Sequence, residues 1–262
     1  MKLAIIGVGA MGEALVAGWI AGGHEPSEIL AVDAHPARLD EMHERYGIQP
    51  ASAEEAAEAD VVFIAVKPYH VAGVLTELAG MRPGSVVASI AAGVSVAALE
   101  AGAAEGVAVV RVMPNTPALV GEGMAGVAPG STATDEHVAT VVELLEAVGR
   151  VAVIEEHQLD VLTALSGSGP AYLFYVAEAM IEAGVHLGLP RPLATELVNQ
   201  TILGSGSMLV ESGRSATQLR EMVTSPAGTT AAALRTLDER GVRAAFLAAV
   251  EACHDRSVEM AD

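Results

Sequence analysis

Short apolar runs alternate with helical stretches through the first half of the chain. Runs of four to six residues predict buried strands at Lys2–Ile6, Ile29–Val32, Val61–Val66, Val86–Ile90, Val107–Val112, Met124–Ala128 and Val151–Ile154. Helical patterns lie between some of these runs, at Glu13–Ala21, Glu54–Ala59 and about Asp135–Val148. This alternation predicts an α/β fold with a Rossmann-like, doubly wound parallel sheet.

After about Glu155 the pattern changes to helices alone. We predict helices at Ala171–Leu187 and Pro192–Val210, a short helix opened by a capping box at Ser215–Gln218, a helix capped by Ser225 that ends near Gly241, and a last helix from about Val242 to Met260. The chain therefore divides into a dinucleotide-binding domain, 1–154, and an all-helical domain for substrate binding and dimerisation, 155–262. These helices are apolar over most of their surface, which favours a subunit interface, with an intramolecular bundle core as the alternative.

The loop after the first strand has the sequence of a dinucleotide fingerprint. Gly7, Gly9 and Gly12 form G-x-G-x-x-G between a strand and a helix, and Asp33 ends the second strand. Such glycines permit a tight turn, close approach of a pyrophosphate and close helix packing, while the acid binds the ribose hydroxyls. In this context the motif is strong evidence for a dinucleotide site.

A second candidate site opens a helix near the other end of the chain. Ser225 is a suitable N-cap and Pro226 suits the first helical position. The free N–H groups of the first turn, beside Gly228, Thr229 and Thr230, favour a carboxylate or a phosphate. An ordinary capped helix would have the same pattern, so this segment alone does not decide between the two.

Taken together, seven motifs in order along the chain resemble the pyrroline-5-carboxylate reductase family. They are GVGAMG (7–12), AVKP (65–68), SIAAGV (89–94), RVMPNTPALVGEGM (111–124), ALSGSGPAYLF (164–174), AGVHLGLPR (183–191) and VTSPAGTT (223–230). The resemblance covers essentially the whole chain. It implies a homodimer or a larger assembly of dimers that reduces 1-pyrroline-5-carboxylate to L-proline, the last step of proline biosynthesis, with NADPH or NADH.

The resemblance also assigns roles to individual residues. It places the cofactor on Ile6, Gly7, Val8, Gly9, Ala10, Met11, Gly12, Asp33, Ser52, Ala65, Val66, Lys67, Pro68, Ser89, Ile90 and Ala91. It places the substrate on Ser225, Gly228, Thr229 and Thr230, and makes Thr230 the catalytic residue, whose hydroxyl faces the imine nitrogen. A threonine is a weak acid, so it relays or orients a proton rather than donating it outright.

Three positions depart from the family pattern. Asp33 stands where small polar or basic residues often accept a 2′-phosphate, although Arg38 and His35 are near enough in sequence to compensate. Ser52 replaces a frequent asparagine on the adenine side, and Ala227 replaces a commoner glycine. The choice between NADH and NADPH therefore stays open.

Charge and composition narrow the remaining classes of function. The formal net charge of −19 argues against nucleic acid and anionic membranes as partners. No uniformly apolar stretch is long enough to span a bilayer, and the single cysteine, Cys253, excludes an internal disulfide and fits a reducing cytoplasm. The eight histidines show no metal-ligand spacing, so we expect no metal site.

Other functions are compatible with the same architecture. A β-hydroxyacid dehydrogenase would need a catalytic lysine in the second domain, but the chain has no lysine after Lys67. A non-catalytic NAD(P)-binding sensor or scaffold would not need the intact SPAGTT segment. A related imine reductase remains open.

Overall fold

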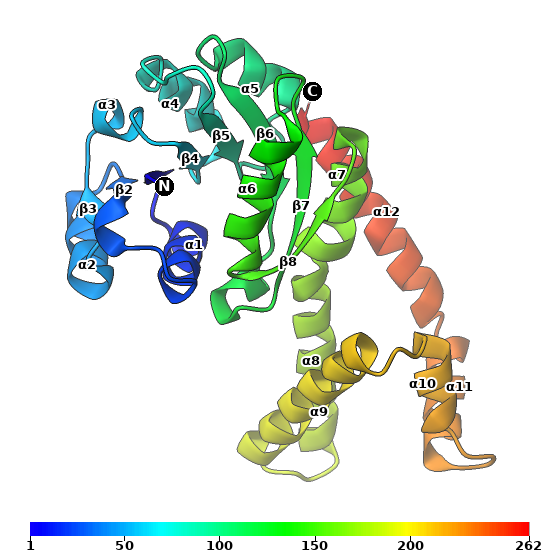
Figure 1. The fold of residues 1–262 in the computed structure, drawn as a ribbon. Helices are drawn as coiled ribbons and strands as arrows, with labels where there is room; N and C mark the ends of the chain where they lie inside the picture. The colour runs from blue at the N-terminus through cyan, green and yellow to red at the C-terminus, as the bar shows by residue number, and fades with distance from the viewer. Residues whose placement is uncertain (262) are drawn as a thin grey trace. The chain divides into compact units, whose positions relative to one another are not determined.

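The computed structural model describes residues 1–261 and divides the chain into two compact units. Unit 1 comprises Met1–Ser168 together with the end of the chain from Cys253, and unit 2 comprises Gly169–Ala252. The long helix α12 (Val242–Ala261) belongs to both units (Figure 1). The boundary between functional domains at residues 154 and 155 remains a proposal, and the last residue of the second domain, Asp262, lies outside the described residues.

Unit 1 is built on one eight-stranded sheet with the order β3-β2-β1-β4-β5-β6-β7-β8 (Figure 1). The strands are β1 (Leu3–Ile6), β2 (Ile29–Val32), β3 (Gln49–Pro50), β4 (Val61–Ile64), β5 (Val86–Ser89), β6 (Ala108–Met113), β7 (Gly123–Pro129) and β8 (Gly149–Val153). The predicted α/β class with a Rossmann-like, mostly parallel sheet is confirmed, and one pair of strands is antiparallel. β7 pairs with β6 in antiparallel register, with Val112 opposite Val127, and then pairs with β8 in parallel. The connection from β6 to β7 holds only the short 3-10 helix η3 (Thr116–Val120), which is too short for a parallel crossover.

Helices cover both faces of this sheet. On one face α1 (Ala10–Ala21), α2 (Pro36–Tyr46) and α6 (Asp135–Glu146) pack through Trp19, Met42 and Leu144, which are fully or almost fully buried. On the other face lie the short helices α3 (Ala53–Ala56), α4 (Val71–Glu77) and α5 (Val96–Gly102). Because the central strands are buried on both faces, they appear in the sequence as continuous apolar runs.

Short segments that the apolar pattern did not predict complete unit 1. Besides α2, β3, α4 and α5, they are the 3-10 helices η1 (Pro26–Glu28), η2 (Pro68–His70) and η4 (Glu156–Gln158), the helix α7 (Leu159–Leu162), and a π-helical turn, η5 (Thr163–Gly167). The π-helical turn begins one residue before the ALSGSGPAYLF motif and overlaps its start, and the N–H of Ser168 donates to the carbonyl of Thr163 at 2.8 Å. π-helical turns are rare and are frequent at functional sites.

Unit 2 is helical, as predicted. It contains α8 (Gly169–His186), α9 (Arg191–Glu211), α10 (Ala216–Met222), α11 (Thr229–Glu239) and the first part of α12. The predicted capping box of α10 is present, because the Ser215 hydroxyl accepts from the N–H of Gln218 and the Gln218 side chain accepts from the N–H of Ser215.

The predicted start of the next helix was wrong. Gly228, rather than Ser225, is the N-cap of α11, and Pro226 lies outside the helix. The N–H of Gly228 donates to the carbonyl of Ser225 at 3.0 Å and closes a turn, within which Ala227 has a φ of 56°. A residue in the left-handed region cannot continue a right-handed helix, so the helix begins after it.

Candidate active site

A cleft of about 1070 Å³ lies at the carboxyl ends of the first strands of unit 1. It is lined by Ile6, Gly7, Gly9, Ala10, Met11, Gly12, Val32, Asp33, Ala34, His35, Ala65, Val66, Lys67, Pro68, Tyr69, His70, Gly73, Val74, Glu77, Ile90, Ala91, Ala92, Met113 and Pro114. Most of the residues predicted to hold the cofactor are in this set. In open α/β sheets, ligands bind at the carboxyl ends of the strands, at the point where the chain order reverses. Here that point lies beside β1, because β2 and β3 follow on one side of it and β4 to β6 on the other.

Three predicted cofactor residues do not line the cleft. Val8 and Ser89 are fully buried. Ser52 caps α3, where its hydroxyl accepts from the N–H of Glu55 while the Glu55 carboxylate accepts from the N–H of Ser52 at 2.8 Å. The roles predicted for these side chains stay predictions.

The three glycines of the fingerprint are required for different reasons. Gly7 has a φ of 96°, and a Cβ there would lie 2.7 Å from the carbonyl oxygen of Ala65. A Cβ on Gly12 would lie 2.2 Å from the carbonyl oxygen of Gly7, so α1 could not approach the loop. A Cβ on Gly9 would have no described atom within 4 Å and would occupy open space at the start of α1. The loop therefore leaves room beside Gly9 for a ligand.

The helix start beside this open space is suited to an anion. Gly9 is the N-cap of α1, and no side chain among the described residues caps that helix. The first N–H groups of a helix carry a partial positive charge and bind phosphate groups. The uncapped helix start and the open space beside Gly9 therefore fit the pyrophosphate of a dinucleotide.

Asp33 is held at the rim of the cleft by the loop itself. One carboxylate oxygen accepts from the N–H of Val8 at 2.9 Å, and the other accepts from the N–H of His35 at 2.9 Å. Burial alone would raise the pKa of Asp33, but these hydrogen bonds to its charged form hold the pKa below its ordinary value. Asp33 is therefore an ionised acceptor at neutral pH.

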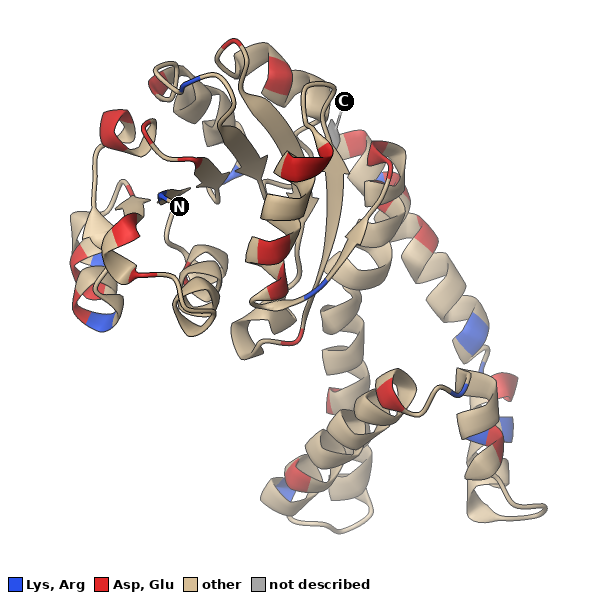
Figure 2. Cartoon of the chain, in the orientation of Figure 1, with Lys and Arg blue, Asp and Glu red and all other residues tan. Residues whose placement is uncertain are grey.

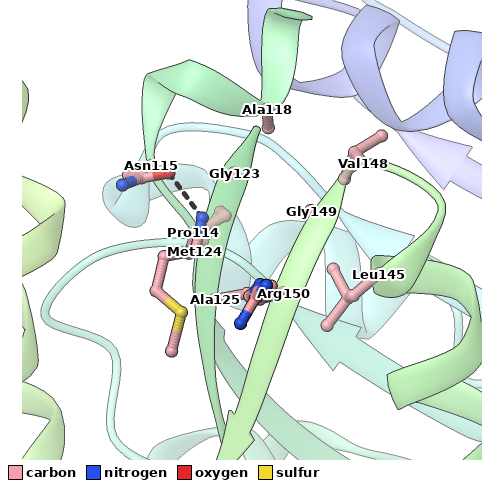
Figure 3. A pocket seen from close by; sticks show the side chains of 10 residues that line it. All are labelled: Pro114, Asn115, Ala118, Gly123, Met124, Ala125, Leu145, Val148, Gly149 and Arg150. Carbon is pink, nitrogen blue, oxygen red and sulfur yellow. Dashed lines mark hydrogen bonds between the residues drawn. The ribbon is translucent and has the colours of Figure 1, made fainter. Parts of the chain in front are cut away.

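A second, much smaller hollow lies at the start of β7 and β8 (Figure 3). Its volume of about 10 Å³ leaves space for one water molecule at most. Asn115, in its wall, accepts from the N–H of Met124 at 2.8 Å and donates to the carbonyl of Ser166 at 3.0 Å. Asn115 thus ties two of the sequence motifs together, and this hollow has a structural role.

The residues predicted to bind substrate lie together in unit 2, in the turn that opens α11. Gly228 is the N-cap, while Thr229 and Thr230 form the first turn of the helix. A Cβ on Gly228 would lie 2.3 Å from the hydroxyl oxygen of Ser225 and 3.1 Å from its carbonyl oxygen, so the Ser225 side chain would have to rotate away. Thr230 is half-buried and Ser225 is exposed.

Sequence reasoning missed several side chains around the cleft. Tyr69 and His70 follow the AVKP motif, and their rings contact each other with centroids 4.4 Å apart and planes tilted by 55°. Their position directly after that motif could have indicated that they lie at the cleft. Among residues 1–261, no cluster of three or more His, Cys, Asp or Glu side chains is placed to hold a metal ion, and no helix is long and apolar enough to cross a membrane.

Two family models match the chain. Residues 156–260 match the model described as pyrroline-5-carboxylate reductase dimerisation, and residues 2–93 match the model described as NADP oxidoreductase coenzyme F420-dependent. The second match includes the fingerprint loop and Asp33.

Similar proteins of known name cover the whole chain. A pyrroline-5-carboxylate reductase of Corynebacterium melassecola is 48% identical over 98% of each chain, and the one of Escherichia coli is 39% identical over 99% of this chain and 98% of its own. The solved structure of a pyrroline-5-carboxylate reductase from Coxiella burnetii has a TM-score of 0.94 at 35% identity and covers 100% of this chain and 98% of its own. The crystal structure of pyrroline carboxylate reductase from Plasmodium falciparum, with NADP bound, has a TM-score of 0.88 at 31% identity over the same shares.

A likeness of this size extends from the dinucleotide loop through the turn that opens α11. With 48% identity to one such reductase over nearly its entire length, the chain belongs to the pyrroline-5-carboxylate reductase family.

Proposed function

We infer that the chain reduces 1-pyrroline-5-carboxylate to L-proline with NADPH or NADH, the last step of proline biosynthesis. The observation that carries this inference is the match to named reductases over the full length of the chain, with the cofactor loop and the VTSPAGTT segment both included. The sensor and the β-hydroxyacid dehydrogenase are not favoured, because the curated relatives are reductases and no lysine follows Lys67.

The cleft of unit 1 holds the cofactor in this proposal. The start of α1 binds the pyrophosphate beside Gly9, and Asp33 accepts hydrogen bonds from the adenosine ribose. The bound nicotinamide supplies a hydride to the imine carbon. The backbone of the AVKP loop, with Ala65 and Val66 in the cleft wall, lies along the same edge and fixes the position of the dinucleotide.

The turn that opens α11 holds the substrate carboxylate. Gly228 exposes the first N–H groups of an 11-residue helix, and among the described residues no side chain caps them. These N–H groups and the helix dipole favour a carboxylate. Ser225 and Thr229 are exposed at the same turn and offer hydroxyl groups beside it.

Thr230 is the residue that we assign to the imine nitrogen. Its hydroxyl can donate a hydrogen bond to that nitrogen and accept one from water, so it orients or relays the proton that the nitrogen gains. The substrate imine can also arrive protonated, in which case Thr230 only positions it.

The helices of unit 2 leave large apolar side chains exposed. Leu173, Phe174 and Tyr175 on α8 are 56%, 67% and 75% exposed, and Leu187 is 84% exposed. Exposed apolar surface of this kind marks an interface between chains, and residues 156–260 match the family's dimerisation model. We therefore propose a homodimer or a larger assembly of dimers in the cytoplasm, without nucleic acid or membrane partners.

Light scattering at low micromolar concentration tests this assembly. The measured mass should be at least twice the 26.7 kDa of one chain, whereas a fully active monomer would contradict the proposal.

Cofactor oxidation with 1-pyrroline-5-carboxylate tests the function directly. Purified protein should oxidise NADH or NADPH only when this substrate is present, and should form proline in equal amount. Other cyclic imines, offered at the same concentration, test the related imine reductase. A folded sample without turnover on either cofactor would favour the non-catalytic sensor.

A further inference from the structure

Glu13, in the first turn of α1, is the centre of a polar network beside the cofactor cleft. One of its carboxylate oxygens accepts from the guanidinium of Arg45 at 2.5 Å and from the hydroxyl of Tyr46 at 2.9 Å. Its other oxygen accepts from the guanidinium of Arg38. Arg38 lies near the start of α2, while Arg45 and Tyr46 lie at its end, so Glu13 binds both ends of that helix.

The same network binds the guanidinium group of Arg38. Each of the three guanidinium nitrogens of Arg38 donates to a protein acceptor: Nε to the carbonyl of Val8 at 2.8 Å, Nη1 to Glu41 at 2.6 Å, and Nη2 to Glu13. The side chain is only 23% exposed. Hydrogen bonds to Glu41 and Glu13 raise the pKa of Arg38 above its already high ordinary value, so it stays charged.

Arg38 is the cation that a 2′-phosphate would need. It follows Asp33 by five residues, and its contact with the Val8 carbonyl places it at the fingerprint loop whose N–H binds Asp33. A 2′-phosphate carries a charge of about −1.5 to −2, and a bidentate arginine is the usual partner for such a group. Arg38 keeps two of its five N–H donors, but Glu13 and Glu41 already neutralise its charge, so a phosphate would have to compete with both carboxylates for it.

The local charge opposes the phosphate further. Asp33, Glu13 and Glu41 carry three negative charges, while Arg38 and Arg45 carry two positive charges. The exposed ring of His35 lies 3.1 Å from Asp33 and adds a positive charge only when it is protonated. Asp33 still has lone pairs free to accept from a ribose, since a carboxylate can accept about four hydrogen bonds. The rim therefore favours a ribose with a free 2′-hydroxyl.

We propose that Glu13 is a specificity-determining residue that commits Arg38 to the protein and thereby selects NADH over NADPH. This inference rests on the proposed function, because it assumes that the cleft binds the cofactor of the reductase. Asp33 is the residue expected from the motif to select the cofactor. The proposal adds Glu13, which acts through its bond to Arg38.

Binding of the oxidised cofactors to the full-length chain tests the proposal without any turnover. NAD⁺ and NADP⁺ are titrated calorimetrically into the wild type and into Glu13→Gln, which keeps a carbonyl acceptor for Arg38 but removes the charge. We expect the wild type to bind NAD⁺ about tenfold or more tightly than NADP⁺, and Glu13→Gln to reduce that ratio by about five- to tenfold, mainly by tighter binding of NADP⁺.

The matched control is Glu58→Gln. Glu58 pairs with Lys2 at 3.1 Å, is 73% exposed, and does not line the cleft. The substitution changes the net charge of the chain by the same amount, so an unchanged NAD⁺/NADP⁺ ratio would show that the effect of Glu13 is local.

A second variant protects the test against a fold defect in Glu13→Gln. Glu41→Gln removes the other carboxylate from Arg38 at an exposed position and should shift the ratio in the same direction by a smaller factor. Tighter binding of NADP⁺ than NAD⁺ by the wild type, or an unchanged ratio in both variants, would overturn the proposal. Turnover with 1-pyrroline-5-carboxylate is measured on the same samples, so that a wrong cofactor preference is distinguished from failure of the proposed function.

Discussion

Alanine substitutions at Gly9 and Gly12 should separate cofactor binding from folding. The two residues lie three positions apart in one loop, yet their surroundings differ. A Cβ on Gly9 would meet no described atom within 4 Å, whereas a Cβ on Gly12 would lie 2.2 Å from the carbonyl oxygen and 3.2 Å from the carbonyl carbon of Gly7. The same added methyl group therefore enters ligand space in one variant and backbone in the other.

The structure sets the size of each effect. Gly9 has φ −65° and ψ −171°, which alanine also adopts, so only its role as N-cap is weakened, at a cost of about 0.5–1 kcal/mol. At Gly12 the clash is with backbone, and overpacking of this kind costs about 1–3 kcal/mol or more in stability. A methyl group on Gly9 would displace a pyrophosphate from N–H groups whose charge-assisted bonds contribute about 1.5–3 kcal/mol each, so we expect NADH affinity to fall about tenfold or more.

Calorimetric titration with NADH and thermal unfolding without cofactor measure the two effects separately. Gly9→Ala should melt near the wild type and bind NADH weakly, and Gly12→Ala should melt at a clearly lower temperature. Unchanged NADH affinity in Gly9→Ala would refute the placement of the pyrophosphate at the start of α1. A wild-type melting temperature in Gly12→Ala would refute the packing argument.

Three further predictions concern the substrate turn and the polar network. Thr230→Val should lower kcat on the order of 10²-fold with cofactor affinity unchanged, and Thr230→Ser should retain much of the activity; a raised KM with intact kcat would make Thr230 a ground-state contact instead. Ala227→Gly should relieve about 1–2 kcal/mol of left-handed strain against about 0.4–1 kcal/mol of added chain entropy, so the melting temperature should rise slightly, and a fall would contradict the argument. The pKa of Glu13 is below its ordinary value, because hydrogen bonds from Arg38 and Tyr46 outweigh the effect of burial. Its stabilising contribution is therefore present above the unfolded pKa of about 4.3 and is lost as the pH falls through the folded pKa. Melting temperatures between pH 6 and pH 3 should fall less steeply in Glu13→Gln than in the wild type, and equal slopes would contradict this.

Composition already predicted the strongly acidic surface. In the ribbon of Figure 2, acidic residues are spread over the helices of both units, with fewer basic residues among them. The chain has 33 acidic and 14 basic residues, so an arginine such as Arg38 has several carboxylates available as partners. Which of them bind it depends on how the helices pack, and composition carries no information on that.

Local patterns were sufficient where neighbours in the sequence decide the structure. The buried strands were predictable because both faces of a central parallel strand are covered, so apolar runs have no polar alternation. The fingerprint loop was predictable because its glycines act on backbone within a few residues. The capping box of Ser215 and Gln218 was predictable for the same reason.

Local patterns failed where a competing turn or the pairing of strands decided the structure. Ser225 and Pro226 have the composition of a helix start, but the turn closed by Gly228 and the left-handed Ala227 move the start of α11 to Thr229. The antiparallel direction of β7 follows from its short connection to β6, and the apolar run Met124–Ala128 alone does not show that direction.

The sequence by itself determined the α/β class, the helical second half, the dinucleotide loop and the family, because each depends on residue type and spacing along the chain. Only the tertiary structure decided which acceptors Arg38 binds. Glu13 and Arg38 are 25 positions apart, and they meet because α1 and α2 pack on the same face of the sheet. An ion pair of this kind forms wherever the fold brings opposite charges together, and no spacing rule along the chain predicts it.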